Sequence, residues 1–159
     1  MHRLWMLGLL VPIAVSAHDE LPCEPPQVTM EVVAPEDVKT FFESKGLTVV
    51  TFLGYSGAEY EHPEELLEQG IKALRSLDRK TTVVNIGATA EGIGALYPEA
   101  KRLGFRTSGI VSTQAQEHAA ALSPCNDYLF FVRDETWGGL LRDGKSLSPT
   151  STAIVTASH

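Results

Sequence analysis

The sequence predicts an α/β protein, a three-layer Rossmann-like sandwich in which helices cover both faces of a mainly parallel sheet. Helical patterns alternate with short apolar segments that have the length and composition of buried strands, near residues 47–53, 82–86, 105–111 and 127–132. The pattern from Thr82 to Ser112 predicts a strand, a loop, a helix and a second strand. Such units are nearly always right-handed and belong to parallel sheets.

In the N-terminal half, Val28–Val33 alternates weakly in hydropathy and is expected to form a first strand. Pro35 is a favourable first residue for a helix, acidic residues follow it, and Gly46 ends this helix. Residues 47–53 are almost continuously apolar, which predicts a central strand buried on both faces. A loop then leads to a helix that begins at Pro63 and has apolar residues at helical spacing.

In the C-terminal half, the glycine-rich loop 87–94 leads into a helix that Gly104 ends. The segment 113–125 is predicted to be helical or irregular. The pair Asp143-Gly144 predicts a tight turn. Ser148-Pro149 predicts the start of a last helix that extends to Ala157.

The N-terminus has the features of a secretory signal peptide over residues 1–17. We therefore expect a periplasmic or secreted protein, with an extended leader over 18–34 and a single Rossmann-like domain over 35–159. In an oxidising compartment, Cys23 and Cys125 could form one disulfide, but the sequence leaves two separate thiols equally open.

Composition narrows the class of partner. The formal net charge of -7 makes non-specific nucleic-acid binding unfavourable. After the signal peptide, no segment of the sequence is long and apolar enough to suggest a membrane span, and the cysteine spacing predicts no zinc site. No metal or other cofactor is expected, and a homo-oligomer is left open.

A ligand site is expected at the carboxyl edge of the sheet. If the strands are parallel, four loops meet there, over 54–62, 87–94, 112–118 and 133–139. The glycines of loop 87–94 would let backbone N–H groups approach an anion, but the same glycines also suit a tight strand-to-helix connection. The loop lacks the Lys-Ser/Thr pair of a nucleotide-binding P-loop, because Ile93-Gly94 stands in its place.

The candidate site residues follow from these loops. Tyr55 or Trp137 would pack on a base, and Thr136 would contribute a hydroxyl. An anion cradle would consist of Ser56, Gly57, Gly87, Thr89, Gly92 and Gly94. In an enzyme, Glu91 or Glu135 would act as general base, and Arg133 would stabilise developing charge.

The order of these pieces resembles the SLOG superfamily, which includes the lysine-decarboxylase-like or LOG proteins. FLGYSG resembles that family's GSS.G opening, VNIGATAEGIGALYPEAKRLGFRTSGIV resembles its GGG..GLMG segment, and DYLFFVRDETWGG occupies the place of its PGG.GT..E strand and loop. The resemblance covers residues 47–139. It implies a Rossmann-like nucleotide binder, and Glu135 lies near the place of the family's catalytic glutamate.

The sequence therefore predicts a protein that binds a nucleotide or a related phosphorylated ligand at the carboxyl edge of its sheet. Two alternatives stay open. One is a hydrolase of N-glycosidic or phosphate bonds in nucleotides, similar to the phosphoribohydrolases of the LOG group. The other is a non-catalytic module that binds a protein partner, for which an exposed Trp137 would be suited.

Overall fold

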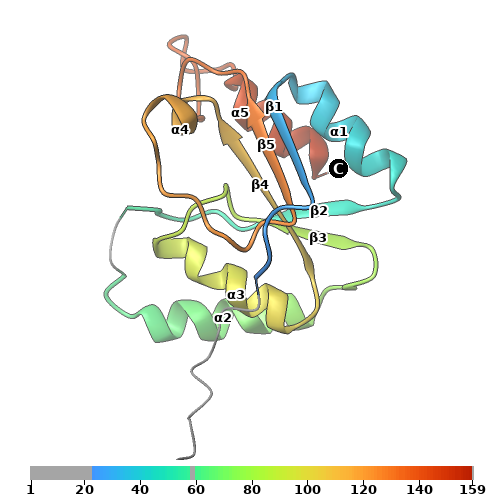
Figure 1. The fold of residues 1–159 in the computed structure, drawn as a ribbon. Helices are drawn as coiled ribbons and strands as arrows, with labels where there is room; N and C mark the ends of the chain where they lie inside the picture. The colour runs from blue at the N-terminus through green and yellow to red at the C-terminus, as the bar shows by residue number, and fades with distance from the viewer. Residues whose placement is uncertain (1–22, 58–59, 159) are drawn as a thin grey trace, which may run out of the picture.

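A parallel sheet forms the centre of the computed structural model, which describes residues 23–57 and 60–158; the predicted signal peptide lies outside these residues. Within them, five strands lie in the order β1-β5-β4-β3-β2, and every neighbouring pair is parallel (Figure 1). The strands are β1 (Val28–Val33), β2 (Thr48–Thr51), β3 (Thr82–Asn85), β4 (Arg106–Ser112) and β5 (Tyr128–Val132).

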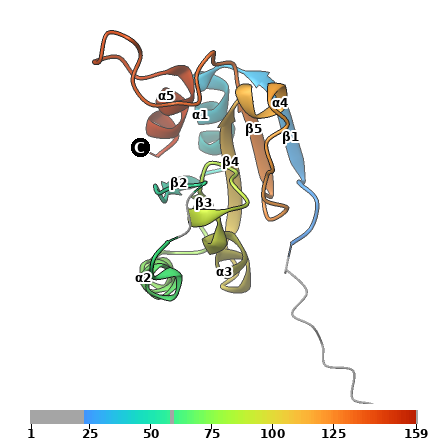
Figure 2. The same cartoon turned by 90° about the vertical axis from the view of Figure 1, so that its left-hand side faces the viewer.

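Helices cover both faces of this sheet (Figures 1 and 2). They are α1 (Pro35–Ser44), α2 (Pro63–Arg75), α3 (Leu96–Arg102), α4 (Gln114–Glu117) and α5 (Pro149–Ala157), with a 3-10 turn at Gly92–Ala95 before α3. Helices α1 and α5 pack on each other, and α2 packs on α3. From β2 to β5 each strand lies beside the next, whereas the connection from β1 to β2 crosses the sheet in the opposite direction. Right-handed crossovers then require α1 on the opposite face from α2 and α3.

The predicted fold class is confirmed, because the described chain is a parallel α/β sandwich. Helix starts at Pro35, Pro63 and Pro149 are also as expected. The Ser148 side chain accepts a hydrogen bond from the Ser151 N–H and so caps α5. The turn at Asp143 forms, since its carboxylate accepts the N–H groups of Lys145 and Ser146.

The prediction of a central strand over residues 47–53 was wrong in position and in length. Strand β2 covers only Thr48–Thr51 and lies at the edge of the sheet, and β4 occupies the centre. The apolar run was misleading because its last residues leave the strand. Phe52 packs against the core beside α2 and α3, whereas Leu53 is 82% exposed.

The core has one layer on each face, because side chains alternate along the strands. Val83 and Phe130 belong to the cluster beneath α1 and α5. Val84 faces α2 and α3, and Phe131 packs with Ala115 of α4. Because all the strands are parallel, their carboxyl ends lie at the same edge of the sheet, and the loops that follow the strands gather there.

The N-terminal segment is fastened to the domain at the opposite end of the sheet. Cys23 forms a disulfide with Cys125, which resolves the alternative left open by the sequence. Strand β1 forms at the predicted position, Val28–Val33, and pairs with β5, so the leader expected over 18–34 includes an edge strand of the sheet. Near the start of β5, Lys101 and Asp127 form a largely buried ion pair of 2.6 Å.

Candidate functional site

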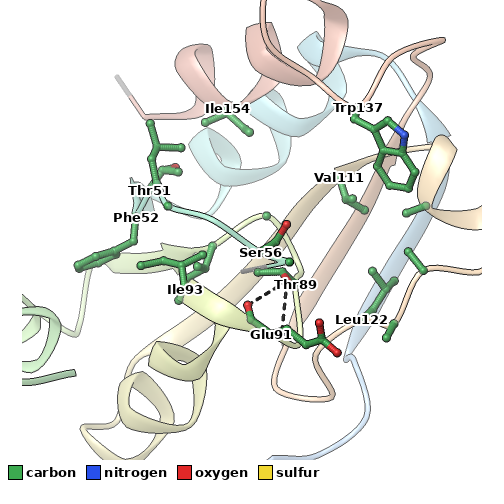
Figure 3. A pocket seen from close by; sticks show the side chains of 18 residues that line it. Thr51, Phe52, Ser56, Thr89, Glu91, Ile93, Val111, Leu122, Trp137 and Ile154 are labelled. Carbon is green, nitrogen blue, oxygen red and sulfur yellow. Dashed lines mark hydrogen bonds between the residues drawn. The ribbon is translucent and has the colours of Figure 1, made fainter. Parts of the chain in front are cut away.

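A cleft of about 490 Å³ opens at the carboxyl edge of the sheet (Figure 3). The loops after β2, β3, β4 and β5 all contribute to it, so their predicted convergence is confirmed. Its lining is mainly apolar, with Phe52, Leu53, Ile86, Ile93, Val111, Ala115, Ala120, Ala121, Leu122, Trp137 and Ile154. The remaining lining residues are Thr51, Gly54, Ser56, Gly57, Gly87, Thr89 and Glu91.

The side chain of Asn85 holds three neighbouring strands, β2, β3 and β4, together beside the cleft. Its amide oxygen accepts the Gly87 N–H at 3.3 Å and the Ile110 N–H at 3.0 Å. Its amide nitrogen donates to the hydroxyl of Thr51 at 3.1 Å. Because Asn85 is fully buried, these bonds also satisfy a polar group that would otherwise be costly to bury. The floor of the cleft is therefore fixed by side-chain hydrogen bonds as well as by the sheet.

The glycine loop is fixed from below by Tyr97 on α3. The Tyr97 hydroxyl accepts the N–H groups of Ile86 and Ala88, each at 3.0 Å, and donates to the Ser108 carbonyl at 2.7 Å. Burial raises the pKa of Tyr97 well above its usual value, although the two N–H donors oppose this effect, so the hydroxyl stays protonated. One buried phenol thus joins the loop after β3 to strand β4.

Two glycines of this loop are required by the protein's own backbone. Gly92 has a φ of +58°, and a Cβ there would lie 2.1 Å from the Tyr55 carbonyl oxygen. A Cβ on Gly94 would lie 2.2 Å from the Thr89 carbonyl oxygen. Gly87 differs, because its φ is +64° but a Cβ would meet nothing within 4 Å. The tight-connection interpretation therefore accounts for Gly92 and Gly94, and Gly87 is the glycine that faces open space.

The opposite wall of the cleft is the segment from α4 to Cys125. The Ser123 N–H donates to the Ala88 carbonyl at 2.8 Å, and Thr89 pairs with Leu122 in a short antiparallel bridge. Ala119 adopts a left-handed φ of +49° where the chain turns after α4. This wall is thus attached directly to the glycine loop and gives the cleft its apolar side.

Trp137 forms one end of the cleft, on the loop between β5 and α5 (Figure 3). Its side chain is 57% exposed, and its ring lies 5.6 Å, centroid to centroid, from that of His118. The loop is anchored by the buried Asp134, which accepts hydrogen bonds from the Thr136 N–H and hydroxyl and from the Thr150 N–H. Burial raises the pKa of Asp134, but these hydrogen bonds outweigh burial and hold the pKa below its usual value.

The structure brings together about half of the predicted site residues. Those that line the cleft are Ser56, Gly57, Gly87, Thr89, Glu91 and Trp137. Gly92 lines a neighbouring pocket of about 630 Å³, formed with the start of α2, which shares Ser56, Gly57 and Glu91 with the cleft. The other predicted residues line neither cavity: Tyr55, Gly94, Arg133, Glu135 and Thr136.

Several residues that hold or line the cleft were not predicted from the sequence. Asn85 carried a weak signal, because it is a polar residue at the end of an apolar strand. Tyr97 carried none, since its neighbours gave it the appearance of an ordinary helix residue. Ile154 and Leu122 line the cleft from segments that the sequence assigned only to a helix and to an irregular region.

Other kinds of site find no support in residues 23–57 and 60–158. No group of three or more His, Cys, Asp and Glu side chains there is arranged to hold a metal ion. In the same residues, no helix combines the length and the apolar character that crossing a membrane requires.

Comparisons with protein-family models, with curated proteins and with solved structures find no match for this chain. The resemblance to the SLOG superfamily therefore stays a prediction.

Proposed function

We propose that the domain binds a small organic ligand with a ring system in the cleft at the carboxyl edge of its sheet. The observation that carries the proposal is a cleft of about 490 Å³, lined by apolar residues together with polar groups, to which the loops of four strands contribute. Clefts of this size, lined by apolar side chains with a few polar groups, are typical small-molecule sites. The carboxyl edge of a parallel sheet is also where ligands of such folds bind.

The nucleotide or related phosphorylated ligand expected from the sequence is one member of this class. A base would find an apolar wall at Trp137, Val111 and Leu122, and a sugar would find hydroxyl groups at Ser56 and Thr89. A phosphate would find fewer partners, because the described part of the lining contains no lysine or arginine. The ring of a nucleotide is therefore better supported by this geometry than its phosphate.

The hydrolase alternative has a narrower basis. Of its three candidate residues, only Glu91 lines the cleft, and Arg133 and Glu135 are exposed outside it. Glycoside hydrolases commonly need two carboxyl groups on either side of the bond that breaks. Binding without turnover is the function that the arrangement supports best.

The expectation that the protein is periplasmic or secreted stays part of the proposal. The predicted signal peptide lies outside the described residues. The disulfide between Cys23 and Cys125 supports the proposal, because structural disulfides persist in oxidising compartments.

Thermal unfolding against a ligand panel tests the binding proposal. The panel contains adenosine, AMP, ADP-ribose, NAD, ribose 5-phosphate and inorganic phosphate. A compound present at one hundred times its dissociation constant should stabilise the protein by about 2.7 kcal/mol. We expect ring-bearing compounds to raise the melting temperature, and ribose 5-phosphate and phosphate to have little effect.

Two matched variants locate the effect. Ser56→Phe places a large side chain on an exposed residue that lines the cleft. Thr40→Phe makes a similar change on the exposed surface of α1, outside the cleft. Stabilisation that persists in Ser56→Phe, or that is lost in both variants, would contradict binding in the cleft.

A second candidate function is supported by an exposed apolar surface beside the cleft. This surface, the hairpin surface, consists of Trp137, Leu140, Leu141 and Leu147, all of which are exposed. Exposed patches of this kind mark interaction sites. If a second copy of the chain binds there, sedimentation should show a dimer that a Leu140→Ser, Leu147→Ser double variant dissociates. If the wild-type protein stays monomeric, self-association through the hairpin surface is excluded.

A further inference from the structure

The charge of the cleft indicates which ligands it accepts. Among the lining residues that the structure describes, Glu91 is the only ionisable acid or base, and it is exposed. Within residues 23–57 and 60–158 its carboxylate takes part in no ion pair. The cleft therefore has one negative charge that the described part of the chain does not neutralise.

The N-termini of α1, α2 and α5 do not favour an anion. Parallel α/β folds commonly hold phosphate at helix N-termini, where free N–H groups and the helix dipole attract it. Here the first turn of α1 contains Glu36 and Asp37, and the first turn of α2 contains Glu64 and Glu65. At α5, the carboxylate of Asp134 already accepts the Thr150 N–H at 2.9 Å. Near the N-termini of these three helices, protein carboxylates therefore repel a phosphate.

The aromatic ring of Trp137 also suits a cation. Trp137 presents an exposed indole ring to the cleft, and aromatic faces attract organic cations. In the view of Figure 3, Trp137 lies at the upper right and Glu91 at the bottom of the cleft, and Val111 and Leu122 lie near the line between them. A ring packed on the apolar wall could therefore extend a charged group toward Glu91.

We propose that the cleft selects positively charged ring compounds, of the class of protonated amines on an aromatic or heteroaromatic ring, over neutral ones, and neutral ones over phosphorylated ones. This inference rests on the proposed function, because it assigns a charge class to the ligand of the same cleft. It reverses the charge that a phosphate-binding protein would prefer.

Three probes that differ only at one position test the charge class. They are 5′-amino-5′-deoxyadenosine, adenosine and adenosine 5′-monophosphate, which present a cation, a neutral hydroxyl and an anion on the same nucleoside. Calorimetric titration at low salt should give an affinity for the amine about threefold to tenfold above that for adenosine, since a single exposed carboxylate acts through partly screened charge. The monophosphate should bind more weakly than adenosine.

Two isosteric variants assign the preference to Glu91. Glu91→Gln should bring the amine to within about twofold of adenosine, because the attracting charge is gone. Glu135→Gln removes one negative charge from an exposed residue outside the cleft and should leave the preference unchanged. Raising the salt concentration should reduce the preference in the wild-type protein.

The outcomes separate the two proposals. If all three probes bind and the monophosphate binds best, the charge inference is overturned but binding in the cleft stands. The same conclusion follows if the preference for the amine survives Glu91→Gln. Binding of none of the three probes would overturn both. An amine preference lost in Glu91→Gln and kept in Glu135→Gln supports the inference.

Discussion

At the scale of single residues, Tyr97 holds the glycine loop in place, although its position in the sequence gave no sign of this role. Its hydroxyl makes three buried hydrogen bonds that join the glycine loop to β4. Tyr97→Phe would leave two backbone N–H groups and one carbonyl without that partner. We expect the free energy of unfolding to fall by about 2–4 kcal/mol, as measured by urea denaturation.

Tyr55→Phe is the control for this variant. Tyr55 is 76% exposed, so removing its hydroxyl should change stability by less than about 0.5 kcal/mol. Equal effects of the two changes would show that the Tyr97 hydroxyl does not hold the loop.

Asp134 makes stability depend on pH in the acid range. Its pKa in the folded protein lies below its usual value, because hydrogen bonds to the carboxylate outweigh burial. The carboxylate therefore adds stability at any pH above the unfolded-state pKa of about 3.9, and this contribution is lost as the pH falls through the lower folded pKa. Asp134→Asn should cost about 1–3 kcal/mol at neutral pH.

The measurement is urea denaturation of wild-type protein and Asp134→Asn at neutral pH and in the acid range. The difference between the two proteins should shrink as the pH falls below about 4. A difference that is the same at both pH values would contradict the role given to the Asp134 carboxylate.

Residues of this kind are hard to find from one sequence. The loops that contain Ser56, Thr89 and Trp137 could be predicted, because they follow apolar strands and are rich in small and polar residues. The partners of Tyr97 and Asn85 depend on which strands become neighbours, and local periodicity does not contain that information. The same limit explains why Arg133 and Glu135 were expected at the site although the structure places them outside the cleft lining.

At the scale of elements, the glycine loop is shaped mainly by its contact with the loop after β2. The Ile93 N–H donates to the Tyr55 carbonyl at 2.9 Å, and Gly92 lies against the same carbonyl. Gly92→Ala combines a left-handed φ with a close overlap and should destabilise the protein by about 3 kcal/mol. Gly87→Ala has the same backbone strain but open space, so we expect a loss of about 1 kcal/mol.

Urea denaturation of the two variants checks this order. A Gly92→Ala protein as stable as Gly87→Ala would mean that the loop after β2 moves to accommodate the added Cβ with no loss of stability. Because Gly92 supports the fold, its replacement is not a clean test of ligand binding. Gly87 and Ser56 are better positions for that purpose.

The edge position of β2 shows what element patterns leave open. The run over residues 47–53 is apolar enough for a buried strand, and a short β2 does form within it. Whether a strand lies at the centre or the edge depends on the order of strands, which the sequence pattern does not specify. The apolar residues after β2 instead contribute to the cleft, where Phe52 and Leu53 are lining residues.

At the scale of the whole molecule, the disulfide fastens the N-terminal segment to the end of the sheet opposite the cleft. It closes a loop between residues 102 positions apart. Cys23→Ser should lower the free energy of unfolding by about 2–4 kcal/mol, mainly because the unfolded chain gains conformational entropy without the cross-link. Ligand affinity should not change, because the Cys125 backbone keeps its hydrogen bonds to Thr107 and Ser123.

Denaturation with and without a thiol reductant measures this effect. Reductant should lower the stability of the wild-type protein by a similar amount and leave Cys23→Ser unaffected. Loss of ligand affinity on reduction would mean that the disulfide also shapes the cleft.

The central claim is that the cleft at the carboxyl edge of the sheet binds a ring-bearing ligand. Its most direct test is an NMR titration of the isotope-labelled protein with 5′-amino-5′-deoxyadenosine. We predict shifts of the Trp137 indole N–H and of the Gly87 and Thr89 amides, which saturate together. Shifts confined to Leu140, Leu141 and Leu147, or none up to millimolar ligand, would contradict the account.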